Sequence, residues 1–141
     1  MPDQSTIDLS KYRLEKAEEM LKAAKRDLKE LDYASANNRA YYSIFHTMRS
    51  VLALDGEDYK KHSAVISRFS LRYLKTDILP RKYGALITNA SLIRNRSDYE
   101  DFYICSIEET QKLVEGAGLF LVSVTSFLEE QYLKSLRSGI C

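Results

Sequence analysis

The stretch SIEETQKLVEGAGLFLVSVTSFLEEQYLKSL, residues 106–136, decides the fold class. Ser106 is followed three residues later by Glu109, and this pair is the capping box that opens a helix. The run behind it is apolar on more than one face, whereas a surface helix needs a single apolar stripe. We therefore expect a long helix, ending near Leu136, that lies at the centre of a bundle, against another chain, or both.

Apolar residues at three- and four-residue steps predict four further helices upstream of this one. Asp32 is a suitable N-cap for the second, Gly56 tolerates the left-handed conformation that ends it, and Pro80 suits the first turn of the fourth. Residues 1–8 are expected to be a flexible N-terminus. The expected helices run from residue 8 or 10 to 31, from 32 to 54, from 61 to 75 and from 80 to 99.

The whole chain, residues 1–141, is expected to form one all-α domain. It would be an antiparallel bundle of about five helices, an up-down core of four completed by one short helix. The 5 glycines and 2 prolines are too few for the turns of an all-β chain of this length. Cys105 and Cys141 have no metal-ligand spacing around them, so we expect free thiols in a reducing cytoplasm.

Neither export nor membrane insertion is expected. The first residues, MPDQSTIDLSKYR, lack the apolar core of a signal peptide. The most apolar stretch, residues 113–128, is about a turn too short for a membrane span and contains Glu115. We therefore expect this stretch to be a buried helix.

Charge is distributed unevenly along the chain, although the net charge is only +1. Residues 1–59 carry 9 Lys and Arg against 11 Asp and Glu, residues 60–96 carry 9 against 1, and residues 97–141 carry 3 against 8. The balances are therefore −2, +8 and −5, which sum to +1. A concentrated basic segment attracts phosphate, or alternatively its charges pair with the acidic last helix.

The segment NRAYYSIFH, residues 38–46, places polar and aromatic residues on one face of the second helix. A solvated helix face usually carries Lys and Glu, so this face is either a half-buried polar network that orients helices or one wall of a ligand or RNA site. Its members, at steps of four, four and three residues, are Asn38, Tyr42, His46 and Arg49.

The fourth helix ends in LIRNRSDYEDFY, residues 92–103, where arginines stand one turn before acidic residues. Arg94 lies beside the core stripe and can pair with Asp98. With Tyr99 beside it, this arginine could grip a phosphate bidentately, or alternatively it forms a structural clamp with Asp98. Because buried polar groups need partners, we expect Arg94, Asp98 or Tyr99 to meet the polar face of the second helix.

His62 stands at the start of the third helix, in KKHSAVISRF, and follows Lys60 and Lys61. These residues at a helix N-terminus could bind an anion, or the imidazole could cap the helix. His46 and His62 form no metal-ligand pattern, and the sequence has no phosphate loop, dinucleotide fingerprint or zinc-binding helix. We therefore expect no metal and no cofactor.

Taken together, NRAYYSIFH, KKHSAVISRF and LIRNRSDYEDF resemble the small stand-alone branch of the HEPN family in order and spacing. The tyrosine pair, the His-Ser opening of the third helix and the Arg-to-Asp-Tyr ending of the fourth are specific as a set. The resemblance implies an antiparallel helical bundle that usually dimerises. Many members are toxins encoded beside a minimal nucleotidyltransferase antitoxin, and active members are metal-independent ribonucleases.

The resemblance also implies a motif on the fourth helix, an Arg followed about four to six residues later by a His, with both protomers contributing to one cleft. The Arg would orient the phosphate and the His would move protons. Arg94 matches the first position, but Tyr99 and acidic residues stand where the His is expected, and no His follows Arg96. A tyrosine with an ordinary pKa of about 10 transfers protons poorly at neutral pH. His46 or His62 could take this role if folding brings one of them close.

The sequence leaves three hypotheses for function. The first is a cytoplasmic HEPN-type homodimer, the toxin-like component of a two-gene module with a nucleotidyltransferase-like partner. It would bind RNA or nucleotide through Arg94 and Arg96, assisted by residues 60–82. The second is a metal-independent ribonuclease that uses Arg94 with a non-standard proton carrier. The third is a structural helical adaptor that binds no nucleic acid.

Overall fold

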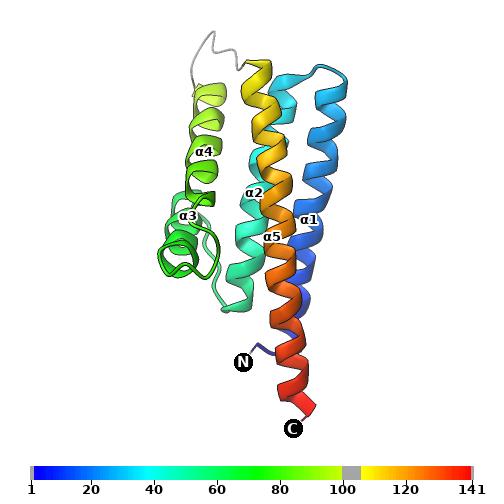
Figure 1. The fold of residues 1–141 in the computed structure, drawn as a ribbon, viewed down its shortest axis with the longest axis vertical. Coiled ribbons are helices and arrows are strands. Elements are labelled where there is room, and N and C mark those ends of the chain that lie inside the picture. The colour runs from blue at the N-terminus through cyan, green and yellow to red at the C-terminus, as the bar shows by residue number, and fades with distance from the viewer. Residues whose placement is uncertain (1, 100–105, 141) are drawn as a thin grey trace.

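The computed structural model describes residues 2–99 and 106–140, with only the backbone described for residues 98–99 and 138–140. Within these ranges the chain is all helical, and the long helices run alternately up and down as an antiparallel bundle (Figure 1). The predicted fold class is confirmed. The elements are α1 (Gln4–Lys29), α2 (Tyr33–Leu54), α3 (His62–Phe69), the π-helical turn η1 (Ser70–Leu74), α4 (Tyr83–Tyr99) and α5 (Ile107–Ile140).

Three predicted helix boundaries are confirmed by the residues that form them. Asp32 precedes α2, and its carboxylate accepts a hydrogen bond from the backbone N–H of Ser35 at 3.2 Å. Gly56, with a φ of +73°, lies in the turn that follows α2. At the start of α5, the Ser106 hydroxyl accepts a hydrogen bond from the backbone N–H of Glu109 at 3.1 Å, which is one half of the predicted capping box.

The first helix begins earlier than its apolar pattern predicted. Asp3 is the N-cap, and its carboxylate accepts a hydrogen bond from the backbone N–H of Thr6 at 2.8 Å. Residues 4–8 therefore belong to α1, and the expectation of a flexible N-terminus through residue 8 is wrong. Periodicity placed the helix start about one turn too late, because the apolar stripe begins inside the helix while the capping residue stands before it.

Two expectations between α2 and α4 are also corrected. The single helix expected over residues 61–75 divides into α3 and η1. In η1 the backbone N–H of Lys75 donates to the carbonyl of Ser70 at 2.9 Å, which is the five-residue step of a π-turn. Pro80 precedes α4, which begins at Tyr83, so Pro80 does not lie in the first helical turn.

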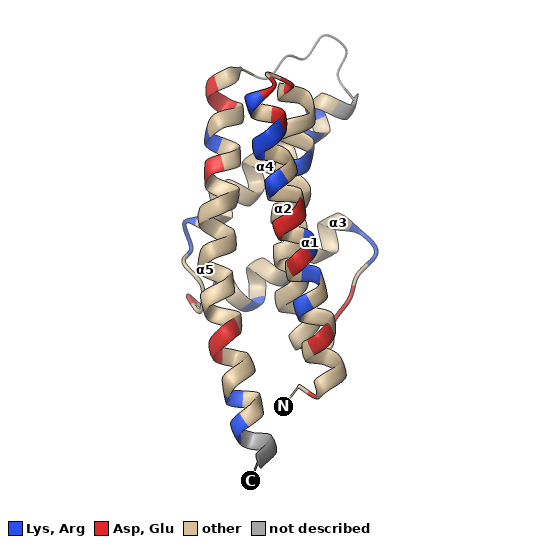
Figure 2. Ribbon diagram, turned by 90° about the vertical axis from the view of Figure 1, so that its right-hand side faces the viewer, with Lys and Arg blue, Asp and Glu red and all other residues tan. Residues whose placement is uncertain are grey.

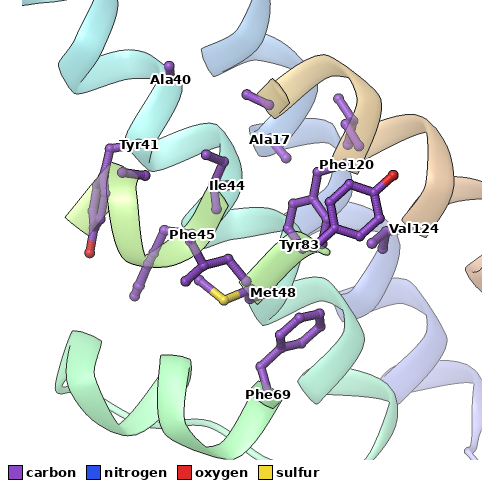
Figure 3. Packing of buried hydrophobic residues seen from close by; sticks show 14 of the residues in the cluster. Ala17, Ala40, Tyr41, Ile44, Phe45, Met48, Phe69, Tyr83, Phe120 and Val124 are labelled. Carbon is purple, nitrogen blue, oxygen red and sulfur yellow. The ribbon is translucent and has the colours of Figure 1, made fainter. Parts of the chain in front are cut away.

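The core is built around α2, which packs against α1, α3, α4 and α5. The last helix, α5, packs mainly against α1, α2 and α4 and reaches α3 through the ring of Phe120, so it shares the core with α2. Phe69 and Phe120 are fully buried, and their rings meet edge to face with centroids 5.7 Å apart. Tyr83 packs on Phe120 at 4.9 Å, so these rings join α3, α4 and α5 (Figure 3).

The helices α1 and α2 approach each other along small residues. Ala17 and Ala40 are fully buried in the core. The Ser43 hydroxyl donates to the carbonyl of Ala17 at 2.9 Å, and the Ser10 hydroxyl donates to the carbonyl of Ser50 at 2.7 Å. A hydroxyl group reaches the backbone of a neighbouring helix only where no large side chain separates the two. These hydrogen bonds therefore fix the register of α1 against α2.

The apolar excess of the last helix is partly core and partly surface. Residues 116–128 of α5 include no charged side chain (Figure 2). Phe120 and Leu121 are buried in the bundle, whereas Leu119 and Val122 are 58% and 68% exposed. No helix among the described residues is long and apolar enough to cross a membrane.

Truncation of Phe120 should test the core. Because its ring is fully buried against Phe69 and Tyr83, Phe120→Ala should lower the free energy of unfolding by about 3–5 kcal/mol. The control Ile107→Ala, at a half-exposed position of the same helix, should change it by less than about 1 kcal/mol. Urea unfolding measures both values, and equal decreases would contradict the described packing.

Candidate functional site

Arg94 of α4 lies against the two consecutive tyrosines of α2. Its guanidinium carbon lies 5.0 Å from the ring centroid of Tyr41 and 5.6 Å from that of Tyr42. One guanidinium nitrogen, Nη2, donates a long hydrogen bond of 3.4 Å to the Tyr42 hydroxyl. The electron-rich faces of aromatic rings attract a cation, so the two rings position the guanidinium. The predicted meeting of Arg94 with the polar face of α2 is therefore observed at Tyr42.

His62, the first residue of α3, is the third member of this group. Its Nδ1 lies 2.9 Å from the Tyr41 hydroxyl, and its ring packs against Phe45 with centroids 4.1 Å apart. The N-cap of α3 is Lys61, which makes no side-chain capping hydrogen bond. The alternative in which the His62 imidazole caps the helix is therefore wrong, because His62 lies inside the helix and turns toward α2.

The surroundings hold the tyrosine and the histidine in their neutral forms. Burial raises the pKa of Tyr41 above its ordinary value, against the lowering effect of the Arg94 charge. Burial lowers the pKa of His62, and the charges of Arg94 and Arg49 lower it further. The neutral imidazole of His62 and the neutral phenol of Tyr41 therefore lie within hydrogen-bonding distance of each other, and the charge of Arg94 lies beside them.

Asn38 shares a surface pocket with Arg94. The pocket has a volume of about 340 Å³ and lies between the first turns of α2 and the second half of α4. Its floor includes Asn37, which is 3% exposed and whose side-chain amide atoms have no hydrogen-bond partner among the described residues. The lining residues are Ala34, Ser35, Asn37, Asn38, Arg39, Arg94 and Ser97.

His46 lies one turn further along α2, against the ring of Tyr42 at a centroid distance of 6.2 Å. Burial lowers its pKa to about 4, and the charges of Arg49, Lys16 and Arg13 contribute in the same direction. The residue belongs to the polar face as predicted. The charges that act on His46 belong mainly to residues of α1 and of α2 itself, whereas the charge of Arg94 acts on His62.

Other residues singled out in the sequence stand apart from this group or outside the described structure. Lys60 and Lys61 are exposed just before α3, and Arg96 is exposed on α4. The side chains of Asp98 and Tyr99 lie outside the described residues.

The basic segment is partly neutralised by acidic residues that the sequence had not paired with it. Arg68 contacts Glu57 at 2.9 Å. Arg72 contacts Glu57 at 3.4 Å and Asp55 at 3.7 Å. These acids follow α2 and do not belong to the acidic last helix. The charge available to a ligand from the segment is therefore smaller than the balance of +8 suggested.

Sequence reasoning missed Tyr41 and Phe45 as members of the site. Only Tyr42 falls on the periodic polar face, although the adjacent tyrosines were a visible signal. The contacts of Tyr41 with His62 and Arg94 join three helices and cannot be derived from spacing within one of them. The described residues contain no group of three or more His, Cys, Asp or Glu side chains that could hold a metal ion.

The chain is similar to known proteins over most of its length. A model of the HEPN domain family matches residues 10–127, which include the whole site. A Methanocaldococcus jannaschii protein named "Putative toxin MJ0605" is 32% identical over 117 residues, covering 83% of this chain and 87% of that protein. From the same organism, "Putative toxin MJ0142" is 30% identical, with coverages of 82% and 78%. A Thermotoga maritima protein named "UPF0332 protein" is 28% identical, with coverages of 84% and 90%.

The pKa of His46 makes stability depend on pH. The folded-state pKa of about 4 lies below the ordinary 6.5, so the unfolded chain binds the proton more readily. The stability that the neutral His46 ring contributes is fully present above pH 6.5, and this contribution is lost as the pH falls toward 4. Between pH 7.5 and 4.5 the wild type should lose about 2 kcal/mol more than His46→Gln. Urea unfolding across this range measures the difference, and parallel profiles would contradict it.

Proposed function

The chain belongs to the HEPN domain family, and we propose that it is a toxin-like member that binds phosphate groups of RNA or of a nucleotide in the cytoplasm. The family match and the relatives named as toxins support its toxin-like character. The single observation that carries phosphate binding is the position of Arg94 over Tyr41 and Tyr42.

A guanidinium held on aromatic rings is suited to an anion. The rings of Tyr41 and Tyr42 lie 5.0 and 5.6 Å from the guanidinium carbon and limit its movement. Its N–H groups form a planar fork that matches two phosphate oxygens. Asn38 lines the adjoining pocket and the Tyr42 hydroxyl lies within hydrogen-bonding distance of Arg94. Both can add neutral hydrogen bonds to a phosphate or a ribose. A phosphate at Arg94 would therefore meet one fixed positive charge and several polar groups.

The proposal includes a homodimer and a nucleotidyltransferase-like partner encoded nearby. The family resemblance motivates both, and the exposed Leu119 and Val122 on the uncharged middle of α5 offer apolar surface to a second chain. A stable interface would bury on the order of 1,000 Å² or more, so it would have to extend beyond these two side chains.

Replacement of Arg94 should weaken RNA binding without unfolding the protein. Arg94→Ala should reduce the affinity for a short single-stranded RNA. The slope of log affinity against log salt should fall by about 0.7, because the variant neutralises one phosphate fewer. Fluorescence anisotropy across a salt series measures this slope, and thermal unfolding measures stability.

The control Lys134→Ala removes the same charge from the far end of α5, away from α4 (Figure 1), and should leave the slope unchanged. Reduced stability with unchanged RNA affinity would favour the structural adaptor. Absence of RNA and nucleotide binding by the wild type would refute the proposal.

A second candidate function, a metal-independent ribonuclease, is favoured by His62. In the tautomer in which Nδ1–H donates to Tyr41, Nε2 is the basic atom, and the lowered pKa keeps the ring neutral. Nε2 would take the proton of a ribose 2′-hydroxyl while its oxygen attacks the adjacent phosphorus. Arg94 would hold the phosphate oxygens, and the departing 5′-oxygen would take a proton from water. His62 would thus replace the histidine that α4 lacks.

RNA cleavage in the presence of a chelator tests this second function. The wild type should cut single-stranded RNA and leave 2′,3′-cyclic phosphate ends, and it should not cut the all-deoxy analogue. His62→Gln should lower the rate by roughly 100-fold or more while RNA affinity stays the same. No cleavage by the wild type, or equal rates for the variant, would eliminate the ribonuclease and leave phosphate binding at Arg94 intact.

A further inference from the structure

A second basic cluster lies on the same face of α2 as the candidate site. Arg49 stands seven residues after Tyr42, and Arg13 of α1 contacts the same carboxylate, that of Asp58. Lys16 of α1 lies close enough to His46 for its charge to act on that ring together with those of Arg49 and Arg13. At the rise of about 1.5 Å per residue, this cluster is about 10 Å from the position of Arg94 along α2. It is separate from the pocket that Arg94 and Asn38 share.

The positive charges of this cluster are held in place by one carboxylate, which is too little to neutralise them. Asp58 lies 3.1 Å from Arg13 and 3.0 Å from Arg49, so one carboxylate orients two guanidinium groups. Arg13 is almost fully buried and donates a weak hydrogen bond of 3.5 Å to the carbonyl of Arg49. Lys16 adds a third positive charge near His46 and makes no ion pair with a described residue, and Asp58 is itself 56% exposed. A local charge excess of this kind attracts an anion.

The outer surface of the cluster is accessible to a ligand. The side chain of Arg49 is 27% exposed, and Lys16 is partly exposed. The Nε atom of Arg49 and the Nδ1 atom of His46 are buried without a hydrogen-bond partner among the described residues. Buried polar atoms without partners are uncommon in native proteins. The Arg49 guanidinium therefore has an N–H group that no described residue accepts from, while the exposed part of its side chain lies beside excess positive charge, as in a site for an anion.

We propose that Arg49 and Lys16, supported by Arg13, form a second phosphate subsite, and that a single RNA strand runs along α2 between this subsite and Arg94. The inference rests on the proposed function, because it extends the RNA bound at Arg94. A spacing of about 10 Å equals the rise of about three stacked nucleotides at 3.4 Å each. Two anchors at this distance select a strand of several nucleotides over a mononucleotide.

The surface between the two anchors suits unpaired bases. The rings of Tyr42 and His46 lie between Arg94 and Arg49 along α2, and both are partly exposed. Proteins that bind single strands combine positive charge along the backbone with aromatic rings on which bases stack. This face of α2 combines the same two features, because the rings of Tyr42 and His46 lie between the charges of Arg94 and Arg49.

His46 reports occupation of the subsite. All the charges that act on its ring lower its pKa, and they belong to Arg49, Lys16, Arg13 and His62. A phosphate seated beside Arg49 and Lys16 would offset their effect. The pKa of His46 should therefore rise from about 4 when the subsite fills.

Two RNA lengths separate the subsite from the Arg94 site. A dinucleotide with a single phosphate cannot span the two anchors, whereas a pentanucleotide can. Lys16→Ala and Arg49→Ala should each lower the salt slope for the pentanucleotide by about 0.7 and leave dinucleotide affinity unchanged. Arg94→Ala should weaken both ligands. Asp58→Asn should strengthen pentanucleotide binding, because it removes the carboxylate that competes with phosphate.

Lys25→Ala is the matched control, since nine helical residues place Lys25 on the face of α1 opposite Lys16. It should leave the binding of both ligands unchanged. NMR titration of the His46 ring should show a raised pKa with the pentanucleotide and not with the dinucleotide.

The subsite is refuted if Lys16→Ala and Arg49→Ala bind the pentanucleotide like the wild type while Arg94→Ala does not; the proposed function then stands. A wild type that binds neither RNA refutes both. Thermal unfolding identifies any variant that fails to fold, and Lys16, which makes no ion pair with a described residue, keeps the test valid if Arg49→Ala is unstable.

Discussion

The close contact of α1 with α2 is the constraint on which the rest of the structure depends. Small residues line this contact, and the hydroxyl of Ser43 hydrogen-bonds to the backbone of Ala17 across it. Once α1 is fixed against one face of α2, the bundle must place its remaining helices on the other faces. The aromatic and polar face of α2 is then covered only in part, by α3 and by the second half of α4.

This partial cover gives the site its chemistry. Complete burial would require every polar group to find a partner within the protein, and complete exposure would leave Arg94 with an unrestricted side chain. Instead, Tyr41 and Tyr42 position the guanidinium, while Tyr41 also holds His62. The helix that carries the arginine lacks the histidine expected of an active ribonuclease of this family. In this fold, the histidine on which the Arg94 charge acts comes from α3.

The helices could largely be predicted from the sequence because their signals are local. Asp32 and Ser106 mark helix starts through hydrogen bonds within one turn, and both were identified correctly. The errors have local causes too. Asp3 was overlooked because the apolar stripe begins after it, and Pro80 was assigned to a helix that starts only at Tyr83.

The site could be predicted only in part. Periodicity grouped Tyr42 with Asn38 and His46, and the motif on α4 identified Arg94. The link between Tyr41 and His62 joins residues 21 positions apart, and that between Tyr42 and Arg94 spans 52. Contacts of this range depend on the packing of whole helices, which no spacing rule within a helix contains.

The proposed RNA site lies on the face of α2 that meets α3 and α4. Chemical-shift mapping with a short single-stranded RNA tests it most directly, because ring protons report their own surroundings. The signals of Tyr41, Tyr42 and His62 should shift and saturate together as RNA is added. Shifts confined to the C-terminal part of α5, around Leu133 and Leu136, would contradict RNA binding at this face.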